Sequence, residues 1–230
     1  MSTPDVITLT RPDGALPVHR FRPAEPSGAG IVLVQEIFGV SSYVRDRARD
    51  LAAQGYEVHV PELYWRIPDH EVDEEAEGML ERGMELMAAT DWDDAVGDTL
   101  AAVEHLRGEL AGRVGLVGFC YGGGVAFETA ARTEVDALVS YYGSALPQLL
   151  DLAPQVTAPS LHHWGTEDAF IPPATVEEIE RALDRDGVEF VRHEGAGHAF
   201  DNPHPAFHHA EASAGAWPHT LAFLDTHLRR

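Results

Sequence analysis

The 230-residue chain contains no lysine, because all 16 of its basic side chains are arginines. Schiff-base catalysis and a phosphate-binding loop that depends on lysine are therefore excluded. The chain has one cysteine, Cys120, so no intramolecular disulfide can form. A structural zinc site built from several thiolates is excluded for the same reason.

Basic charge is also scarce. The chain carries 38 acidic side chains and a formal net charge of −22. Such a chain repels the phosphates of nucleic acids and anionic membrane surfaces, so we expect neither as a partner. No apolar run approaches the roughly 18 residues that span a bilayer. Residues 1–5 carry no basic region followed by an apolar stretch, so we find no signal peptide and expect a cytoplasmic protein.

The sequence does contain enough apolar residues, 44%, for a substantial core. No linker rich in proline, glycine or serine divides it, so we expect a single domain over residues 1–230. Apolar runs alternate with longer amphipathic segments. The predicted strands are 6–9, 16–21, 31–35, 56–60, 114–117, 137–141, 160–164 and 188–193. The predicted helices are 43–54, 69–90, 92–109, 121–132, 173–185 and 217–228.

This order predicts an α/β fold with a mostly parallel sheet of about seven or eight strands and helices on both faces. Residues 12–14, Pro-Asp-Gly, predict a hairpin turn between the first two strands. Residues 61–92 could form either a partial cap over the carboxyl edge of the sheet or a plain pair of crossover helices.

Residues 118–122 read Gly-Phe-Cys-Tyr-Gly and lie between a predicted strand and an Ala/Gly-rich helix. This G-x-C-x-G pattern is typical of a nucleophile elbow, in which the nucleophile sits on a sharp, strained turn. Bulky neighbours would clash across that turn, which explains Gly118 and Gly122. The helix that follows directs its positive N-terminus at the sulfur of Cys120 and favours a thiolate. The alternative is a buried cysteine in a glycine-rich turn.

The partners of a nucleophile elbow follow it in the order acid, then histidine. Asp168 comes just after the strand 160–164, and His198 comes after the last strand. Glu167 is the fallback for the acid. A helix-capping role for Asp168 and a structural role for His198 are the alternatives. The backbone N–H groups of Tyr121 and Ile37 are the candidate oxyanion donors.

Four segments together carry a resemblance to a known family: residues 35–39 (Gln-Glu-Ile-Phe-Gly), 61–64 (Pro-Glu-Leu-Tyr), 115–123 and 195–198 (Gly-Ala-Gly-His). With these four segments in this order, the sequence resembles the dienelactone hydrolase family over essentially its whole length. The resemblance implies an α/β-hydrolase fold without a large lid and a Cys120–His198–Asp168 triad. It also implies that Glu36 lies beside the thiol and influences its ionisation.

The family's dienelactone-cleaving members bind the substrate carboxylate with arginines. One of these arginines lies four residues after the histidine, and this position is Asn202 here. The other lies in the helical segment after residues 61–64, where the nearest candidate is Arg82, or Leu80 under a different alignment. Aromatic residues that follow strand ends or flank the triad could form the wall of an apolar pocket. These candidates are Phe38, Tyr64, Trp65, Tyr142 and Phe200.

The sequence therefore predicts a cysteine-dependent hydrolase of a small lactone, enol ester or other activated ester, which needs no cofactor and acts as a monomer or small homo-oligomer. A thioesterase or broad aryl esterase would use the same residues, and a non-catalytic binding protein of the same fold is a third alternative. His204 and His208 have the i, i+4 spacing of metal ligands, but prolines flank His204, so we expect a surface cluster and no metal site.

Overall fold

The computed structural model describes residues 5–229, which form one eight-stranded sheet in the order β1-β2-β4-β3-β5-β6-β7-β8. All six strands from β3 to β8 run parallel, and the N-terminal hairpin joins them antiparallel. The strands are β1 (Asp5–Arg11), β2 (Gly14–Phe21), β3 (Gly30–Val34), β4 (Glu57–Pro61), β5 (Val114–Phe119), β6 (Ala137–Tyr141), β7 (Ser160–Gly165) and β8 (Val188–His193).

The central strands β3 to β7 are buried along their whole length, whereas the edge strand β8 is half-exposed. Parallel strands covered on both faces take continuous apolar runs, which is why residues 31–34 and 114–117 read without alternation. The predicted fold class and the hairpin are confirmed.

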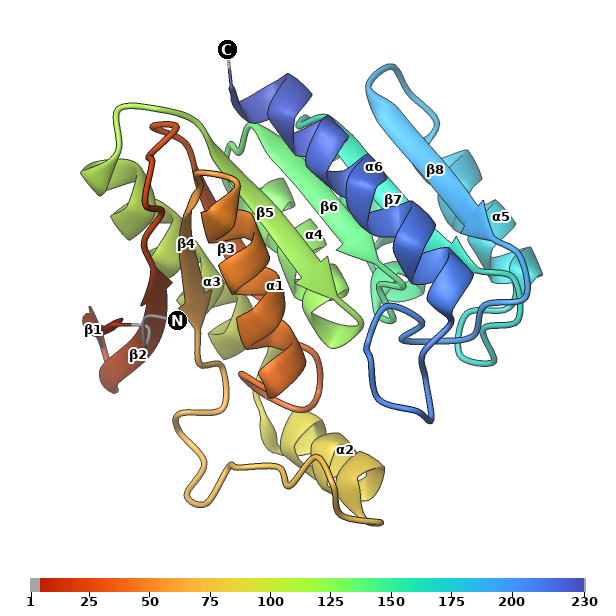
Figure 1. The fold of residues 1–230 in the computed structure, drawn as a ribbon, viewed down its shortest axis with the longest axis horizontal. Helices are drawn as coiled ribbons and strands as arrows, with labels where there is room; N and C mark the ends of the chain where they lie inside the picture. The colour runs from red at the N-terminus through yellow and green to blue at the C-terminus, as the bar shows by residue number, and fades with distance from the viewer. Residues whose placement is uncertain (1–4, 230) are drawn as a thin grey trace.

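Six helices within residues 5–229 surround the sheet, five of them on its two faces. Figure 1 shows α1 and α6 on one face and α3, α4 and α5 on the other. The carboxyl ends of β3 to β8 meet at one edge, and α2 lies beyond that edge. The helices are α1 (Ser42–Ala53), α2 (Met79–Ala89), α3 (Trp92–Glu109), α4 (Tyr121–Arg132), α5 (Pro173–Leu183) and α6 (Ala210–Leu228).

The prediction of a helix over residues 69–90 is wrong for its first half. Helix α2 begins only at Met79, and residues 62–78 are turns and irregular chain. Asp69 adopts a positive φ of 52°, and the acidic side chains crowded between residues 69 and 77 would repel one another on a helix. Glu74 fastens this segment to the start of α1 by accepting bonds of 2.7 Å from the backbone N–H and the hydroxyl of Ser42.

The last helix is longer than predicted, because α6 begins at Ala210 and not at residue 217. The imidazole of His209 caps it by accepting a bond from the N–H of Ala212. Pro218 lies inside the helix. Two short 3-10 helices between β6 and β7, Leu146–Gln148 and Leu150–Gln155, were not predicted.

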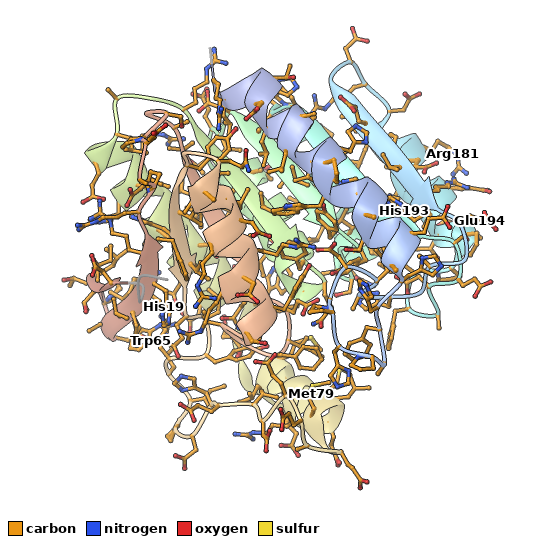
Figure 2. All side chains as sticks on the ribbon, in the orientation of Figure 1. His19, Trp65, Met79, Arg181, His193 and Glu194 are labelled. Atoms are coloured by element: carbon orange, nitrogen blue, oxygen red, sulfur yellow. The ribbon has the colours of Figure 1, made fainter. Side chains whose placement is uncertain are left out.

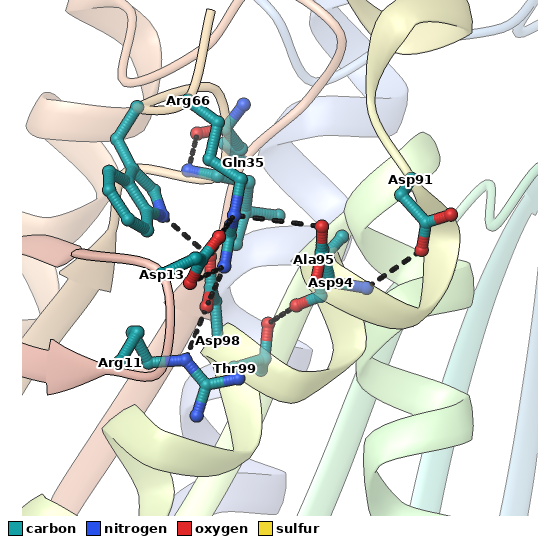
Figure 3. Close-up of polar contacts among 11 residues, drawn as sticks. Arg11, Asp13, Gln35, Arg66, Asp91, Asp94, Ala95, Asp98 and Thr99 are labelled. Atoms are coloured by element: carbon teal, nitrogen blue, oxygen red, sulfur yellow. Dashed lines mark hydrogen bonds and ion pairs between the residues drawn. The ribbon is translucent and has the colours of Figure 1, made fainter. Parts of the chain in front are cut away.

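A buried carboxylate on α3 ties the hairpin to the segment that leads to α2 (Figure 3). Asp98 is fully buried and accepts bonds from Nε of Arg11 at 2.7 Å, from the indole of Trp65 at 2.8 Å and from Nη1 of Arg66 at 2.6 Å. Arg66 also binds Asp13 in the hairpin turn. Two arginines balance the charge of this carboxylate, which burial would otherwise make costly.

Candidate active site

Cys120 lies between β5 and α4 with φ 53° and ψ −116°, a backbone conformation that side-chain-bearing residues rarely adopt. A Cβ atom at Gly118 would collide with the backbone of Gly122, and a Cβ atom at Gly122 would collide with the carbonyl of Gln35. The two glycines thus allow three backbone segments to approach one another at the turn. The expected strand–turn–helix geometry is present at Cys120.

The structure brings the three predicted triad side chains together from three separate loops. The Sγ atom of Cys120 lies 3.0 Å from Nε2 of His198, and Nδ1 of His198 lies 2.7 Å from Oδ2 of Asp168. The other carboxylate oxygen of Asp168 accepts bonds from the N–H groups of Phe170 and Ile171. The imidazole is therefore held at both nitrogens, which is the arrangement of a nucleophile, a base and an orienting acid.

The environment of His198 favours its charged form. Burial by itself would lower the pKa of His198, but the charge of Cys120 and the hydrogen bond to Asp168 outweigh it and raise the pKa to about 10. Because Asp168 is only 3% exposed, its charge acts on His198 with little solvent screening.

Glu36 follows β3 and lines the same cavity as the thiol, with only 1% of its surface exposed. Burial raises the pKa of this carboxyl to about 7, against the opposing effect of its hydrogen bond to Asn202 and of the charge on His198. The amide of Asn202 donates to Oε2 at 2.8 Å, and the hydroxyl of Tyr142 lies 3.4 Å from Oε1. Burial thus favours the neutral, protonated form of this carboxyl.

A chain of buried polar groups leads from Glu36 to α1 and α6, and sequence reasoning did not find it. The hydroxyl of Tyr142 lies 3.4 Å from that of Tyr43, and Tyr43 donates a bond of 2.5 Å to Asp201. Arg47 binds both oxygens of Asp201, at 2.8 and 2.7 Å. The end of this network away from Glu36 is therefore fixed by an ion pair whose carboxylate is almost fully buried.

The thiol opens into a cavity of about 150 Å³ between α2 and the loops that carry the triad. Ser144 also lines the cavity, with its hydroxyl 3.9 Å from Sγ of Cys120. Sequence reasoning missed Ser144 because nothing in the local pattern marks it. It named Leu80 only as an alternative to Arg82, and it missed five other apolar lining residues: Met84, Met87, Phe170, Ala199 and Phe207.

The two candidate oxyanion donors are Ile37 and Tyr121. Ile37 lines the cavity, and Tyr121 is the first residue of α4, so its N–H has no acceptor within the helix. Phe38 also lines the cavity. Tyr64 is buried beneath this loop, where its hydroxyl donates to the carbonyl of Ile37 at 3.1 Å.

Four other predicted pocket residues do not line the cavity. Tyr142 and Phe200 are fully buried, and the ring of Tyr142 supports the imidazole of His198 from 5.2 Å. Trp65 binds Asp98 and lies on the hairpin side of the molecule (Figure 2). Arg82 lies on α2, but its guanidinium binds Glu85 and the carbonyl of Asp69.

Among residues 5–229, no group of three or more His, Cys, Asp or Glu side chains has the geometry to hold a metal ion. His162 and His163 point to opposite faces of β7, since His162 stacks on Trp164 and His163 binds Thr220 of α6. No helix in the same range is both long and apolar enough to cross a membrane.

The model of the dienelactone hydrolase family matches residues 16–228, nearly the whole chain. The chain belongs to this family. A carboxymethylenebutenolidase of Pseudomonas putida is 37% identical over 206 residues, which cover 88% of this chain and 87% of the relative. Carboxymethylenebutenolidase 1 of Cupriavidus pinatubonensis is 30% identical over 203 residues, with 87% of each chain covered. The resemblance inferred from the four sequence segments is confirmed.

Solved structures of dienelactone hydrolases have the same fold. The structure of a putative dienelactone hydrolase from Klebsiella pneumoniae matches with a TM-score of 0.80 and 29% identity, over 95% of this chain and 96% of that chain. A dienelactone hydrolase from Anabaena variabilis matches with a TM-score of 0.70 over 99% of this chain and 100% of that chain. At 20% identity, the second likeness shows the fold alone. As a member of the dienelactone hydrolase family, the chain is a hydrolase.

Proposed function

We propose that this hydrolase cleaves an activated carboxylic ester or lactone with Cys120 as the nucleophile, through a thioester acyl-enzyme. The observation that carries the proposal is the 3.0 Å contact between Sγ of Cys120 and Nε2 of His198, continued at 2.7 Å to Asp168. Membership of the dienelactone hydrolase family supports the ester and lactone class.

In the first half of the reaction, the thiolate of Cys120 adds to the carbonyl carbon of the substrate. The carbonyl oxygen takes up the negative charge and accepts bonds from the N–H groups of Ile37 and Tyr121. The tetrahedral intermediate then collapses, the C–O bond to the alcohol breaks, and Nε2 of His198 gives its proton to the departing oxygen. A thioester on Cys120 remains.

In the second half, neutral His198 takes a proton from water, and the resulting hydroxide adds to the thioester carbonyl. Collapse of this intermediate breaks the C–S bond, releases the carboxylic acid and restores the thiolate–imidazolium pair. Asp168 keeps the imidazole in one orientation throughout and stabilises its charged form.

Thiolate chemistry restricts the substrate. After a thiolate adds to a carbonyl, the intermediate expels its better leaving group, and a thiolate leaves more readily than an ordinary alkoxide or an amide nitrogen. Acylation is therefore productive for enol esters, strained lactones, aryl esters and thioesters. We expect little or no amidase activity.

The test is steady-state hydrolysis of a dienelactone and of a short aryl ester by the wild type, Cys120→Ala and Cys120→Ser. We expect Cys120→Ala to lose turnover of every substrate that the wild type cleaves. Cys120→Ser should retain only a small fraction of the wild-type activity. Circular dichroism and thermal unfolding serve as controls for folding. Full activity in Cys120→Ala would exclude the mechanism.

A further inference from the structure

The cavity beside Cys120 has few polar groups. Apart from Glu36, Cys120, Ser144 and His198, its lining is apolar. A cavity of about 150 Å³ with apolar walls is the size that holds a single aromatic ring or a short acyl group. The apolar members are Ile37, Phe38, Leu80, Met84, Met87, Phe170, Ala199 and Phe207.

The mouth of the cavity is apolar as well. Four large apolar side chains are strongly exposed among residues 5–229, and three of them line this cavity: Leu80 at 45%, Met84 at 42% and Phe170 at 64%. The fourth, Val6, lies on β1, and the chain as a whole carries a net charge of −22. An apolar rim around one opening therefore marks the place where an apolar ligand would gain most by leaving water.

Helix α2 turns one face to the cavity and the other to solvent. Leu80, Met84 and Met87 recur at the spacing of one helical face and all line the cavity. Arg82 lies on another face, where Glu85 and the carbonyl of Asp69 hold its guanidinium. The basic residue nearest in sequence to the lining is thus committed elsewhere.

Among residues 5–229, no arginine lines the cavity, so an anionic group entering it would find no unpaired cation in that range. The charge of His198 is already shared between Cys120 and Asp168. The amide of Asn202 is bound to Glu36, and its carbonyl oxygen accepts from the N–H of His204. A buried carboxylate without a partner is strongly unfavourable, and the net charge of −22 repels anions before they arrive.

We propose that this site accepts neutral esters with an apolar acyl group and discriminates against substrates that carry a carboxylate. The group next to the carbonyl carbon occupies the cavity, and the remainder lies across Leu80, Met84 and Phe170. This inference rests on the proposed function, since it assigns a substrate class to the same thiol.

The test compares 4-nitrophenyl acetate, 4-nitrophenyl pentanoate and the 4-nitrophenyl half-ester of glutaric acid. The last two differ only in that a carboxylate replaces the terminal methyl group. We expect kcat/KM to rise about tenfold from acetate to pentanoate, because the longer chain fills the apolar lining. The half-ester should be slower than the pentanoate by about 100-fold or more, because its carboxylate has no partner.

Leu80→Arg introduces a cation at the cavity, and Glu81→Gln is its matched control. Both raise the net charge by one unit, but Glu81 is exposed on α2 and does not line the cavity. We expect Leu80→Arg to raise the kcat/KM of the half-ester, relative to that of the pentanoate, by roughly tenfold. Glu81→Gln should leave the ratio unchanged. Equal shifts in both variants would mean that long-range charge, and not the lining, sets the preference.

A binding measurement separates this inference from the mechanism. Calorimetric titration of Cys120→Ala with the same two esters should detect the pentanoate and not the half-ester. Turnover that depends on Cys120 but shows equal rates for both esters would overturn the inference and leave the mechanism standing. Absence of turnover together with selective binding of the pentanoate would overturn the mechanism and leave the inference standing. Equal binding of both esters would overturn the inference in either case.

Discussion

The side-chain amide of Asn202 donates a hydrogen bond of 2.8 Å to the carboxylate of Glu36, and both groups are buried. The two residues are 166 positions apart in the sequence. Asn202 thereby holds one oxygen of a carboxyl group whose pKa burial raises to about 7, while Tyr142 lies near the other. Glu36 is therefore expected to change its protonation state at a higher pH than an exposed glutamate.

Glu36→Gln should alter how stability depends on pH. In the folded wild type, burial raises the pKa of Glu36 to about 7 from an ordinary value of 4.5. The folded state then binds more protons than the unfolded state between these values, so stability falls as pH rises through this window. The contribution of Glu36 to the free energy of unfolding should fall by about 3 kcal/mol from pH 4 to pH 8. Gln has no ionisable proton, so Glu36→Gln should remove this dependence.

Urea unfolding of the wild type and Glu36→Gln across this pH range measures the effect as a difference between the two proteins. Glu81→Gln is the control, since it removes an exposed carboxylate from α2. Parallel stability curves for the wild type and Glu36→Gln would show that Glu36 does not titrate in this window.

Asp168→Asn should impair catalysis without displacing the histidine. The amide can still bond to Nδ1 of His198, but it no longer stabilises the imidazolium and can hold the wrong tautomer. We expect kcat/KM to fall by about 10³- to 10⁴-fold, as when the acid of a hydrolase triad is neutralised. Neighbouring Glu167 is exposed, so Glu167→Gln should keep wild-type rates. A large loss in Glu167→Gln with none in Asp168→Asn would reassign the acid.

Asp98→Ala should destabilise the fold without touching the chemistry. Removing this fully buried carboxylate leaves Arg11 and Arg66 without their partner, which costs about 3–5 kcal/mol. Asp94→Ala is the control, since Asp94 lies 3.6 Å from Arg66 and is half-exposed, which predicts a change of about 1 kcal/mol or less. Chemical denaturation of the two variants compares the effects.

Asp98 also holds Arg66 and Trp65 at the start of the segment that leads to α2. Since α2 lines the cavity, we expect KM of Asp98→Ala to rise while kcat on a short ester changes little. Equal stability of Asp98→Ala and Asp94→Ala would contradict the stabilising role assigned to the buried carboxylate of Asp98, whose contacts Figure 3 shows.

The elbow was predictable because its cause is local. A nucleophile on a strained turn needs small neighbours, and the glycines at positions 118 and 122 meet that need within five residues. Asp168 and His198 could also be predicted, because parallel strands bring their carboxyl ends to one edge. The order of strand, turn and helix thus indicated which loops would meet.

The lining of the cavity could not be predicted, because it depends on where α2 begins and which way it turns. The periodicity of residues 69–90 does not show whether Arg82 or Leu80 faces the site, whereas the structure places Leu80 in the cavity lining. The partner of Glu36 was missed for a different reason. Asn202 lies in an irregular loop after His198, and no periodic pattern signals a contact with residues after β3.

Rapid quenching of the wild type during turnover of 4-nitrophenyl pentanoate, followed by mass spectrometry of the peptide that contains Cys120, tests the covalent mechanism itself. We predict that this peptide gains the mass of the acyl group as a thioester, which hydroxylamine removes. Two variants are run in parallel: His198→Ala should show little of this adduct, and Cys120→Ala should show none. Turnover without an adduct on Cys120, or an adduct on another residue, would contradict the assignment of Cys120 as the nucleophile.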